Sequence, residues 1–193
     1  MKKIIFSFLI LAFNLNAGIH QEGIFDYKVD RLQGHALEVA KSISATGVLK
    51  KKSNGYYYLD ISNEYITKIF PILILDGHLR PTDSFGSEEG AHITVVTDGE
   101  KCEGLEAEVG KEFTFEVLEF RTVTALKSYA IGPGSYHTGD RWMIAVQSPE
   151  LEELRMKYGL QPLVNRHDFH ISIGFEVPFN RINNFGTTPK PQR

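Results

Sequence analysis

The chain has 193 residues, of which 42% are hydrophobic, and carries 21 Lys and Arg against 24 Asp and Glu, a formal net charge of −3. This length and apolar content suffice for one sizeable core. The acidic balance excludes a surface that coats long nucleic acids, because such binding rests on many Lys and Arg contacts to phosphate.

The first 17 residues predict a secretory signal peptide. Lys2 and Lys3 precede an apolar stretch of about ten residues, and Ala17 offers a small residue at the expected cleavage point. A short membrane anchor is the weaker alternative, because a spanning helix needs about 20 apolar residues. We therefore expect an exported protein, periplasmic or secreted, with no membrane span after signal removal. Its single cysteine, Cys102, cannot form an internal disulfide.

The N-terminal half predicts helices and strands in alternation. The expected elements are an amphipathic helix within 26–44 that stops at Gly47, a strand over 55–61, a short helix over 63–70 limited by Pro71, a buried apolar run over 72–75, a turn at Asp76-Gly77, a polar loop over 80–90 and a strand from Ala91.

The C-terminal half predicts further strands and one well-capped helix. The expected elements are strands over 112–120, 121–127 and 141–147, a helix over 149–158 with Ser148 as N-cap, Pro149 at its first position and Gly159 as its stop, a strand from Phe169, and a mobile tail over 183–193. The two halves resemble each other, since each offers a helix, a loop and a strand that carries a histidine. We expect one domain over 18–182.

Two short segments repeat the same pattern inside strand-like runs, namely His92-Ile93-Thr94-Val95 and His170-Ile171-Ser172-Ile173. Successive side chains of a strand point to opposite faces, so each histidine shares a face with the hydroxyl residue two positions on. If the two strands lie close together, one cleft receives two proton-transfer groups and two hydroxyl donors. That layout suits the cleavage of a phosphodiester.

With these motifs the sequence resembles the two-histidine (2H) phosphoesterase superfamily over roughly residues 55–178, nearest to a diverged RNA-repair-like bacterial branch. The resemblance implies an α+β fold of two related antiparallel-sheet lobes with flanking helices around a central cleft. It also implies metal-independent hydrolysis without a cofactor, with His92 and His170 as acid and base and Thr94 and Ser172 as the phosphate-binding hydroxyls. Which histidine plays which role stays open.

The expected substrate is a small nucleotide or RNA end with a cyclic or 2′-linked phosphodiester, bound by a monomer. Additional contacts are expected from arginines that neutralise phosphate and from aromatic rings that stack on a base. These candidates are Arg80, Arg141, Arg166, Tyr57, Phe85 and Tyr136.

Two other functions fit parts of the same pattern. A metal hydrolase would use His167 and His170 with His92, His137 and Asp168, but no helical His-Glu-x-x-His or cysteine-based zinc spacing occurs. Alternatively, an exported binding module would hold a nucleotide or another phosphorylated ligand in the same cleft without turnover. Walker-type, dinucleotide-binding and nucleophile-elbow motifs are absent from the sequence.

Overall fold

The computed structural model describes residues 20–22, 25–29, 34–73, 78–79, 89–125, 129–132, 135–137 and 140–176. Several sequence predictions lie outside these residues: the signal peptide over 1–17, the turn at Asp76-Gly77, the candidates Arg80 and Phe85, and the tail over 183–193.

Antiparallel strands dominate the described chain. They are β1 (His20–Glu22), β2 (Phe25–Val29), β3 (Thr46–Lys51), β4 (Tyr57–Ile61), β5 (His78–Leu79), β6 (His92–Val96), β7 (Glu112–Thr114), β8 (Glu116–Ala125), β9 (Tyr129–Gly132), β10 (Ser135–His137), β11 (Asp140–Gln147) and β12 (Phe169–Glu176). The helices are α1 (Gly34–Lys41), α2 (Glu64–Thr67), α3 (Phe70–Leu73), the 3₁₀ helix η2 (Leu105–Glu108) and α5 (Pro149–Lys157). Among the residues described, none of these helices has the length and apolar character needed to cross a bilayer.

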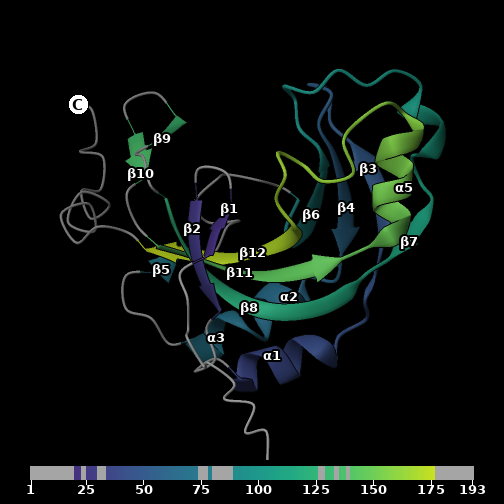
Figure 1. Ribbon diagram of the computed structural model, residues 1–193. Coiled ribbons are helices and arrows are strands. Elements are labelled where there is room, and N and C mark those ends of the chain that lie inside the picture. The colour runs from purple at the N-terminus through teal and green to yellow at the C-terminus, as the bar shows by residue number, and fades with distance from the viewer. Residues whose placement is uncertain are drawn as a thin grey trace, which may run out of the picture.

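The strands form a ten-stranded sheet in the order β1-β2-β8-β11-β12-β6-β4-β3-β7, with β5 added to β12, while β9 and β10 pair separately. Figure 1 shows this sheet curling into a half-barrel, with α1, α2 and α3 gathered beneath one face and α5 beside β3 and β7. The fold is therefore α+β, as predicted, but the predicted division into two lobes is not confirmed. The strands follow one hydrogen-bonded path, in which β12 joins β6 through the single register pair Ile171 and Ile93.

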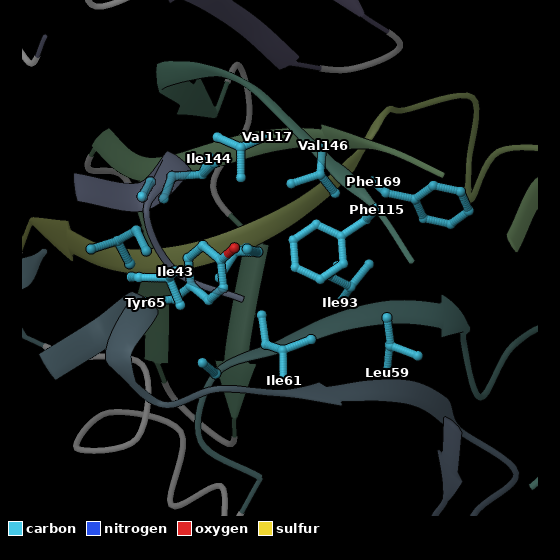
Figure 2. Packing of buried hydrophobic residues seen from close by; sticks show 14 of the residues in the cluster. Ile43, Leu59, Ile61, Tyr65, Ile93, Phe115, Val117, Ile144, Val146 and Phe169 are labelled. Atoms are coloured by element: carbon cyan, nitrogen blue, oxygen red, sulfur yellow. The ribbon is translucent and has the colours of Figure 1, made fainter. Parts of the chain in front are cut away.

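The core fills the helix-covered face of the sheet. Figure 2 shows Val117, Ile144 and Val146 from β8 and β11 facing Leu59 and Ile61 from β4. Alternate residues of each strand supply these side chains, so that β4 buries its odd-numbered positions and exposes the even-numbered ones to the other face. Helix α1 covers this core with Ala36 and Ala40, both fully buried. The opposite face of β6 and β12 carries His92, Thr94, His170 and Ser172.

The helix predicted within 26–44 is only partly correct. Its second half forms α1, but residues 25–29 form β2, in which Tyr27 lies opposite Val123 of β8. Phe25, Tyr27 and Val29 alternate with polar residues, which is the spacing of a strand, whereas the apolar residues at helical spacing begin only at Leu32. Gly47 does not stop the helix either, because it lies within β3, where an added Cβ would meet the carbonyl oxygen of Asp60 at 2.7 Å.

Two other boundaries differ in detail from the sequence prediction. Pro71 does not limit a helix but occupies the second position of α3, where the missing N–H is not needed. The strands over 112–127 break at Phe115 rather than between 120 and 121. By contrast, the capped helix is confirmed: Ser148 Oγ accepts the backbone N–H of Leu151 at 3.3 Å, and Gly159 follows the end of α5 with φ 79°.

Candidate functional site

The two histidine motifs lie on neighbouring strands. Ile93 of β6 and Ile171 of β12 form a register pair, and both side chains are fully buried in the core. Because side chains alternate, the residues on either side of each isoleucine point to the opposite face. An antiparallel register through this pair aligns His92 with Ser172, and Thr94 with His170. The structure therefore brings the two motifs to one place on the sheet, as the sequence predicted.

Both imidazoles are held in the same way. Nδ1 of His92 lies 2.9 Å from the carbonyl oxygen of Gly90, and Nδ1 of His170 lies 3.2 Å from the carbonyl oxygen of Asp168. A carbonyl oxygen can only accept, so each Nδ1 carries a proton and donates it. Nε2 of each ring is left for proton exchange with a ligand, because this nitrogen is on the far side of the ring.

Surrounding protein lowers the pKa of His170 to about 4. Burial is the largest cause, since it disfavours the charged imidazolium, and electrostatic interactions with His167, Arg141 and His92 act in the same direction. The hydrogen bond to Asp168 opposes the shift without reversing it. His170 is consequently neutral near pH 7, and its Nε2 carries a lone pair that can take a proton.

Thr94 is fixed by a tyrosine. The hydroxyl of Tyr56 lies 2.6 Å from Thr94 Oγ1. The Tyr56 ring stacks on Tyr58 at 6.0 Å between centroids, and Tyr58 meets His92 edge to face at 5.7 Å. Lys52 lies over the Tyr56 ring, with Nζ 5.2 Å from its centroid. These contacts form a continuous aromatic wall beside His92 and Thr94.

The backbone before His92 is also fixed. Asn63, just before α2, accepts the backbone N–H of Ala91 on its side-chain oxygen at 2.8 Å. Gly90 has φ 67°, and an added Cβ there would collide with the same Asn63 side chain. Only glycine fits this position, and its carbonyl oxygen is the group that orients the His92 ring.

A cavity of about 210 Å³ opens beside these motifs. It is lined by Thr94, Thr97, Arg121, Val123, Arg141, Met143, Val164, Asn165, His167, Asp168, Phe169 and His170. A larger and more open depression of about 500 Å³ lies between α5 and β7, away from both motifs. The smaller cavity, which contains one residue of each histidine motif, is therefore the candidate binding site.

Charged side chains line this cavity. Arg121 is buried and donates to Asp168 at 2.8 Å and to Glu119 at 2.7 Å. Burial lowers the pKa of Arg141 to about 10, so that its guanidinium remains charged at neutral pH. Asp168 contributes twice, since its carboxylate binds Arg121 and its carbonyl oxygen orients His170.

The structure supports only some of the residues that the sequence predicts as additional substrate contacts. Arg141 lines the cavity, and Arg166 is exposed between two lining residues. The prediction for Tyr57 is wrong: its side chain is 2% exposed and belongs to the core, because it occupies a core-facing position of β4. Tyr136 belongs to β10, but its side chain, like all of Arg80 and Phe85, is outside what the structure describes.

Sequence reasoning missed Tyr56, Tyr58 and Arg121. The alternation in the run 57–61 could have found the tyrosines, since Leu59 and Ile61 mark the core face and leave even-numbered residues for the other face. Arg121 carries no such local signal, because its partner Asp168 is distant in the chain.

The sequence also offers residues for a metal site, with His167 and His170 at its centre. Within the described residues, no group of three or more His, Cys, Asp and Glu side chains is arranged to hold a metal ion. The side chain of His137, a further candidate ligand, is not among those described.

Comparison with known proteins agrees with the geometry. A family model described as Swiss Army Knife, 2H phosphoesterase domain, matches residues 57–178. This range contains both histidine motifs and all the residues that line the cavity. No curated protein and no solved structure shows detectable similarity to the chain. Phosphoester hydrolysis is the chemistry that the match indicates, and the chain belongs to the 2H phosphoesterase family.

Proposed function

We propose that the protein is a metal-independent phosphodiesterase that hydrolyses a cyclic or 2′-linked nucleotide phosphodiester. One observation carries the proposal: two histidines on neighbouring strands each donate Nδ1–H to a backbone carbonyl and thereby present Nε2 for proton transfer. Histidine is suited to both proton roles near neutral pH. We assign the hydroxyls of Thr94 and Ser172, which share the sheet face of the histidines, as donors to the phosphoryl oxygens.

The two histidines take different roles. His170 is the base, because burial keeps it neutral, and its Nε2 removes a proton from the attacking water. The water oxygen forms a bond to phosphorus as the bond from phosphorus to the ribose oxygen breaks. His92 is the acid, and its Nε2 proton passes to the departing ribose oxygen. Thr94 and Ser172 stabilise the charge that collects on the phosphoryl oxygens.

The aromatic wall of Tyr56 and Tyr58 supplies the surface on which a nucleobase stacks. Base stacking on aromatic side chains contributes about 1–3 kcal/mol per base and tolerates any base. We therefore propose a nucleotide or an RNA end as the ligand, with the base against this wall and the phosphodiester between the histidines.

We also propose that the protein is exported. The signal-like apolar segment over 1–17 supports export, which fractionation of cells and mass spectrometry of the N-terminus would test.

The proposal is tested by incubating the mature protein with 2′,3′-cyclic nucleotides, 2′–5′ linked dinucleotides and 3′–5′ cyclic nucleotides in excess EDTA. We expect hydrolysis of at least one of the first two classes at an unchanged rate with EDTA. Loss of activity in EDTA that returns on adding a divalent metal would contradict the mechanism. Tight binding of these nucleotides without product would identify a binding module instead.

Tyr56→Phe is expected to lower kcat about 3- to 10-fold, because the hydroxyl that orients Thr94 is lost. A net hydrogen bond contributes about 0.5–1.5 kcal/mol, which corresponds to this range. Tyr58→Phe is the matched control, since Tyr58 lies on the same wall and contacts His92 through its ring. Steady-state kinetics on the best substrate checks both variants. An equal loss of kcat in both would show that the hydrogen bond from Tyr56 to Thr94 is not its cause.

A further inference from the structure

A buried arginine contacts the residue whose carbonyl group orients His170. Arg121 is 7% exposed, and its guanidinium donates to the carboxylates of Asp168 at 2.8 Å and Glu119 at 2.7 Å. The backbone carbonyl oxygen of the same Asp168 lies 3.2 Å from Nδ1 of His170. A single residue therefore connects the guanidinium on β8 to the imidazole on β12.

The carbonyl of Asp168 lies outside the strand pairing. Asp168 comes just before β12, and the pairing of β11 with β12 ends at Val146 and Phe169. The residues before it form a tight turn, in which Asn165 and Arg166 both have positive φ. Strand hydrogen bonds alone therefore do not fix the position of this carbonyl group.

Arg121, by contrast, belongs to a fixed part of the backbone. It lies within β8, which pairs with β2 on one side and with β11 on the other, and its register partners are Val29 and Met143. From β8 its side chain reaches past β11 to Asp168. The side chain of Asp168 is thereby attached to the centre of the sheet.

Orientation of Asp168 accounts for this arginine better than stability or phosphate binding does. Replacing a buried ion pair with apolar side chains is often neutral for stability. Nε and Nη2 of Arg121 are already bonded to carboxylates, which leaves less of its charge for a bound phosphate. With Glu119 on one edge of the planar guanidinium and Asp168 on another, the geometry suits the fixing of a neighbouring group.

The position of this carbonyl matters because a neutral imidazole has two tautomers. Only the tautomer with its proton on Nδ1 has a lone pair on Nε2, and the hydrogen bond made by Nδ1 selects between the two. His170 is neutral near pH 7, since its pKa is lowered to about 4. Its ability to act as a base therefore depends on where the carbonyl oxygen of Asp168 lies.

We propose that Arg121 is a positioning residue, which acts through Asp168 to hold His170 in the tautomer that a base requires. The role of His170 as base rests on the proposed function, whereas its tautomer can be measured without any substrate. Arg121 transfers no proton itself and affects the reaction only through the carbonyl group of Asp168.

His92 supplies a comparison within the same protein. The carbonyl that binds its Nδ1 belongs to Gly90, and the next backbone N–H along the chain donates to the side chain of Asn63. Asn63 thus fixes the segment before His92, as Arg121 fixes the segment before His170. Removal of one anchor is expected to affect one histidine and not the other.

Long-range proton–nitrogen NMR spectra of the imidazoles test the proposal near pH 8, where an ordinary histidine is neutral. Signals of the two rings are assigned from the His92→Ala and His170→Ala variants. In the wild-type protein we expect both rings to carry the proton on Nδ1. In Arg121→Met we expect His170 to populate both tautomers while His92 is unchanged, and in Asn63→Ala we expect the reverse.

Further variants keep the test independent of a loss of folding. Asp168→Ala removes the carboxylate but leaves the backbone carbonyl, and because this side chain is 34% exposed, its loss disturbs packing less than loss of the buried arginine. We expect the same mixture of His170 tautomers in this variant. Glu119→Gln is the matched control, since it changes the other carboxylate on Arg121 and should leave the tautomer of His170 unchanged.

Steady-state kinetics on the same variants separates positioning from substrate binding. Arg121→Met and Asp168→Ala are expected to lower kcat about 10- to 100-fold, as a misplaced catalytic group does, with KM changed less than about 3-fold. Arg121→Lys keeps a donor for Asp168 and should retain a kcat between those of the wild-type protein and Arg121→Met.

A single Nδ1–H tautomer of His170 in both Arg121→Met and Asp168→Ala would overturn the inference. A raised KM with unchanged kcat in Arg121→Met would also overturn it, because Arg121 would then be a substrate-binding residue. If the wild-type protein hydrolyses none of the phosphodiesters, the proposed function fails, while the NMR spectra still decide whether Arg121 positions His170.

Discussion

Replacing His170 or His92 with alanine is expected to lower kcat by about 100- to 10,000-fold, the range in which a positioned acid or base contributes. Each variant removes the Nε2 atom that transfers the proton and leaves the strand pairing intact, since both rings lie on the face away from the core. Steady-state kinetics on the substrate found in the screen, with unfolding midpoints for both variants, checks the result. His35→Ala, on the exposed side of α1, is the matched control and should keep full activity.

The pH dependence distinguishes the two histidines. The pKa of His170 is lowered to about 4, so this base stays unprotonated as the pH falls through 6.5 and is lost only near pH 4. We expect kcat/KM of the wild-type protein to fall on the acid side with an inflection near pH 4. An acid-side inflection near 6.5 would contradict the assignment of His170 as base. Near-full activity in either alanine variant would remove that histidine from the mechanism.

The lowered pKa of His170 also makes the free energy of unfolding depend on pH. An unfolded histidine binds a proton as the pH falls through about 6.5, whereas His170 in the folded protein does not until about pH 4. The unfolded state therefore binds more protons across this interval, and the free energy of unfolding decreases as the pH falls from 6.5 to 4. His170→Ala should remove this part of the pH dependence in urea titrations.

Arg155→Met is expected to lower the free energy of unfolding by about 3 kcal/mol, at the lower end of the range for breaking a buried ion pair. Arg155 is 1% exposed, and it binds Glu100 at 2.6 Å. It also donates to the carbonyl oxygens of Val95, Gln161 and Leu163, which belong to β6 and to the segment after α5. The substitution leaves all of these acceptors without their donor.

Glu100 contributes to this cost. Burial acts to raise the pKa of its carboxyl, but hydrogen bonds from Arg155 and from Thr97 outweigh burial, so that the pKa is lowered. Without Arg155 the carboxylate is partly buried with no guanidinium beside it. Urea unfolding checks the prediction. Met156→Ala, on the exposed side of the same helix, should change stability by less than about 0.5 kcal/mol, and a similarly small loss in Arg155→Met would refute this account.

Because the pKa of Glu100 is lowered, the stability that its ion pair with Arg155 contributes depends on pH. This carboxylate contributes stability above the pKa of an unfolded glutamate, and the contribution is lost as the pH falls through the lower folded value. Arg155→Met should therefore differ less from the wild-type protein in strong acid than at neutral pH.

The motifs could be predicted from sequence because their geometry is local. Strand alternation alone places His92 beside Thr94 and His170 beside Ser172 on one face. Burial of Ile93 and Ile171 follows from the same alternation. Likewise, the cap of α5 depends on residues next to one another in the chain, and the structure has it as predicted.

The other parts of the site depend on pairings between distant segments. Arg121 and Asp168 meet only because β8, β11 and β12 lie side by side, and irregular registers in β11 shift which residues face the cavity. The strand β2 carries alternating apolar residues at Phe25, Tyr27 and Val29, but its partner β8 is distant in the chain. Short-range patterns carry no information about such partners, so the alternation in β2 could indicate a strand, but the cavity could not be found from local spacing.

The register pair of Ile93 and Ile171 joins β6 to β12, two strands that are distant in the chain. Each half of the sheet can form its own strand pairs, yet a single backbone pair between distant segments brings the two imidazoles together. Closing such a long loop is entropically costly and tends to come late. We therefore expect turnover to appear during refolding only once β6 and β12 have paired, which activity measured in parallel with a spectroscopic probe of folding would check.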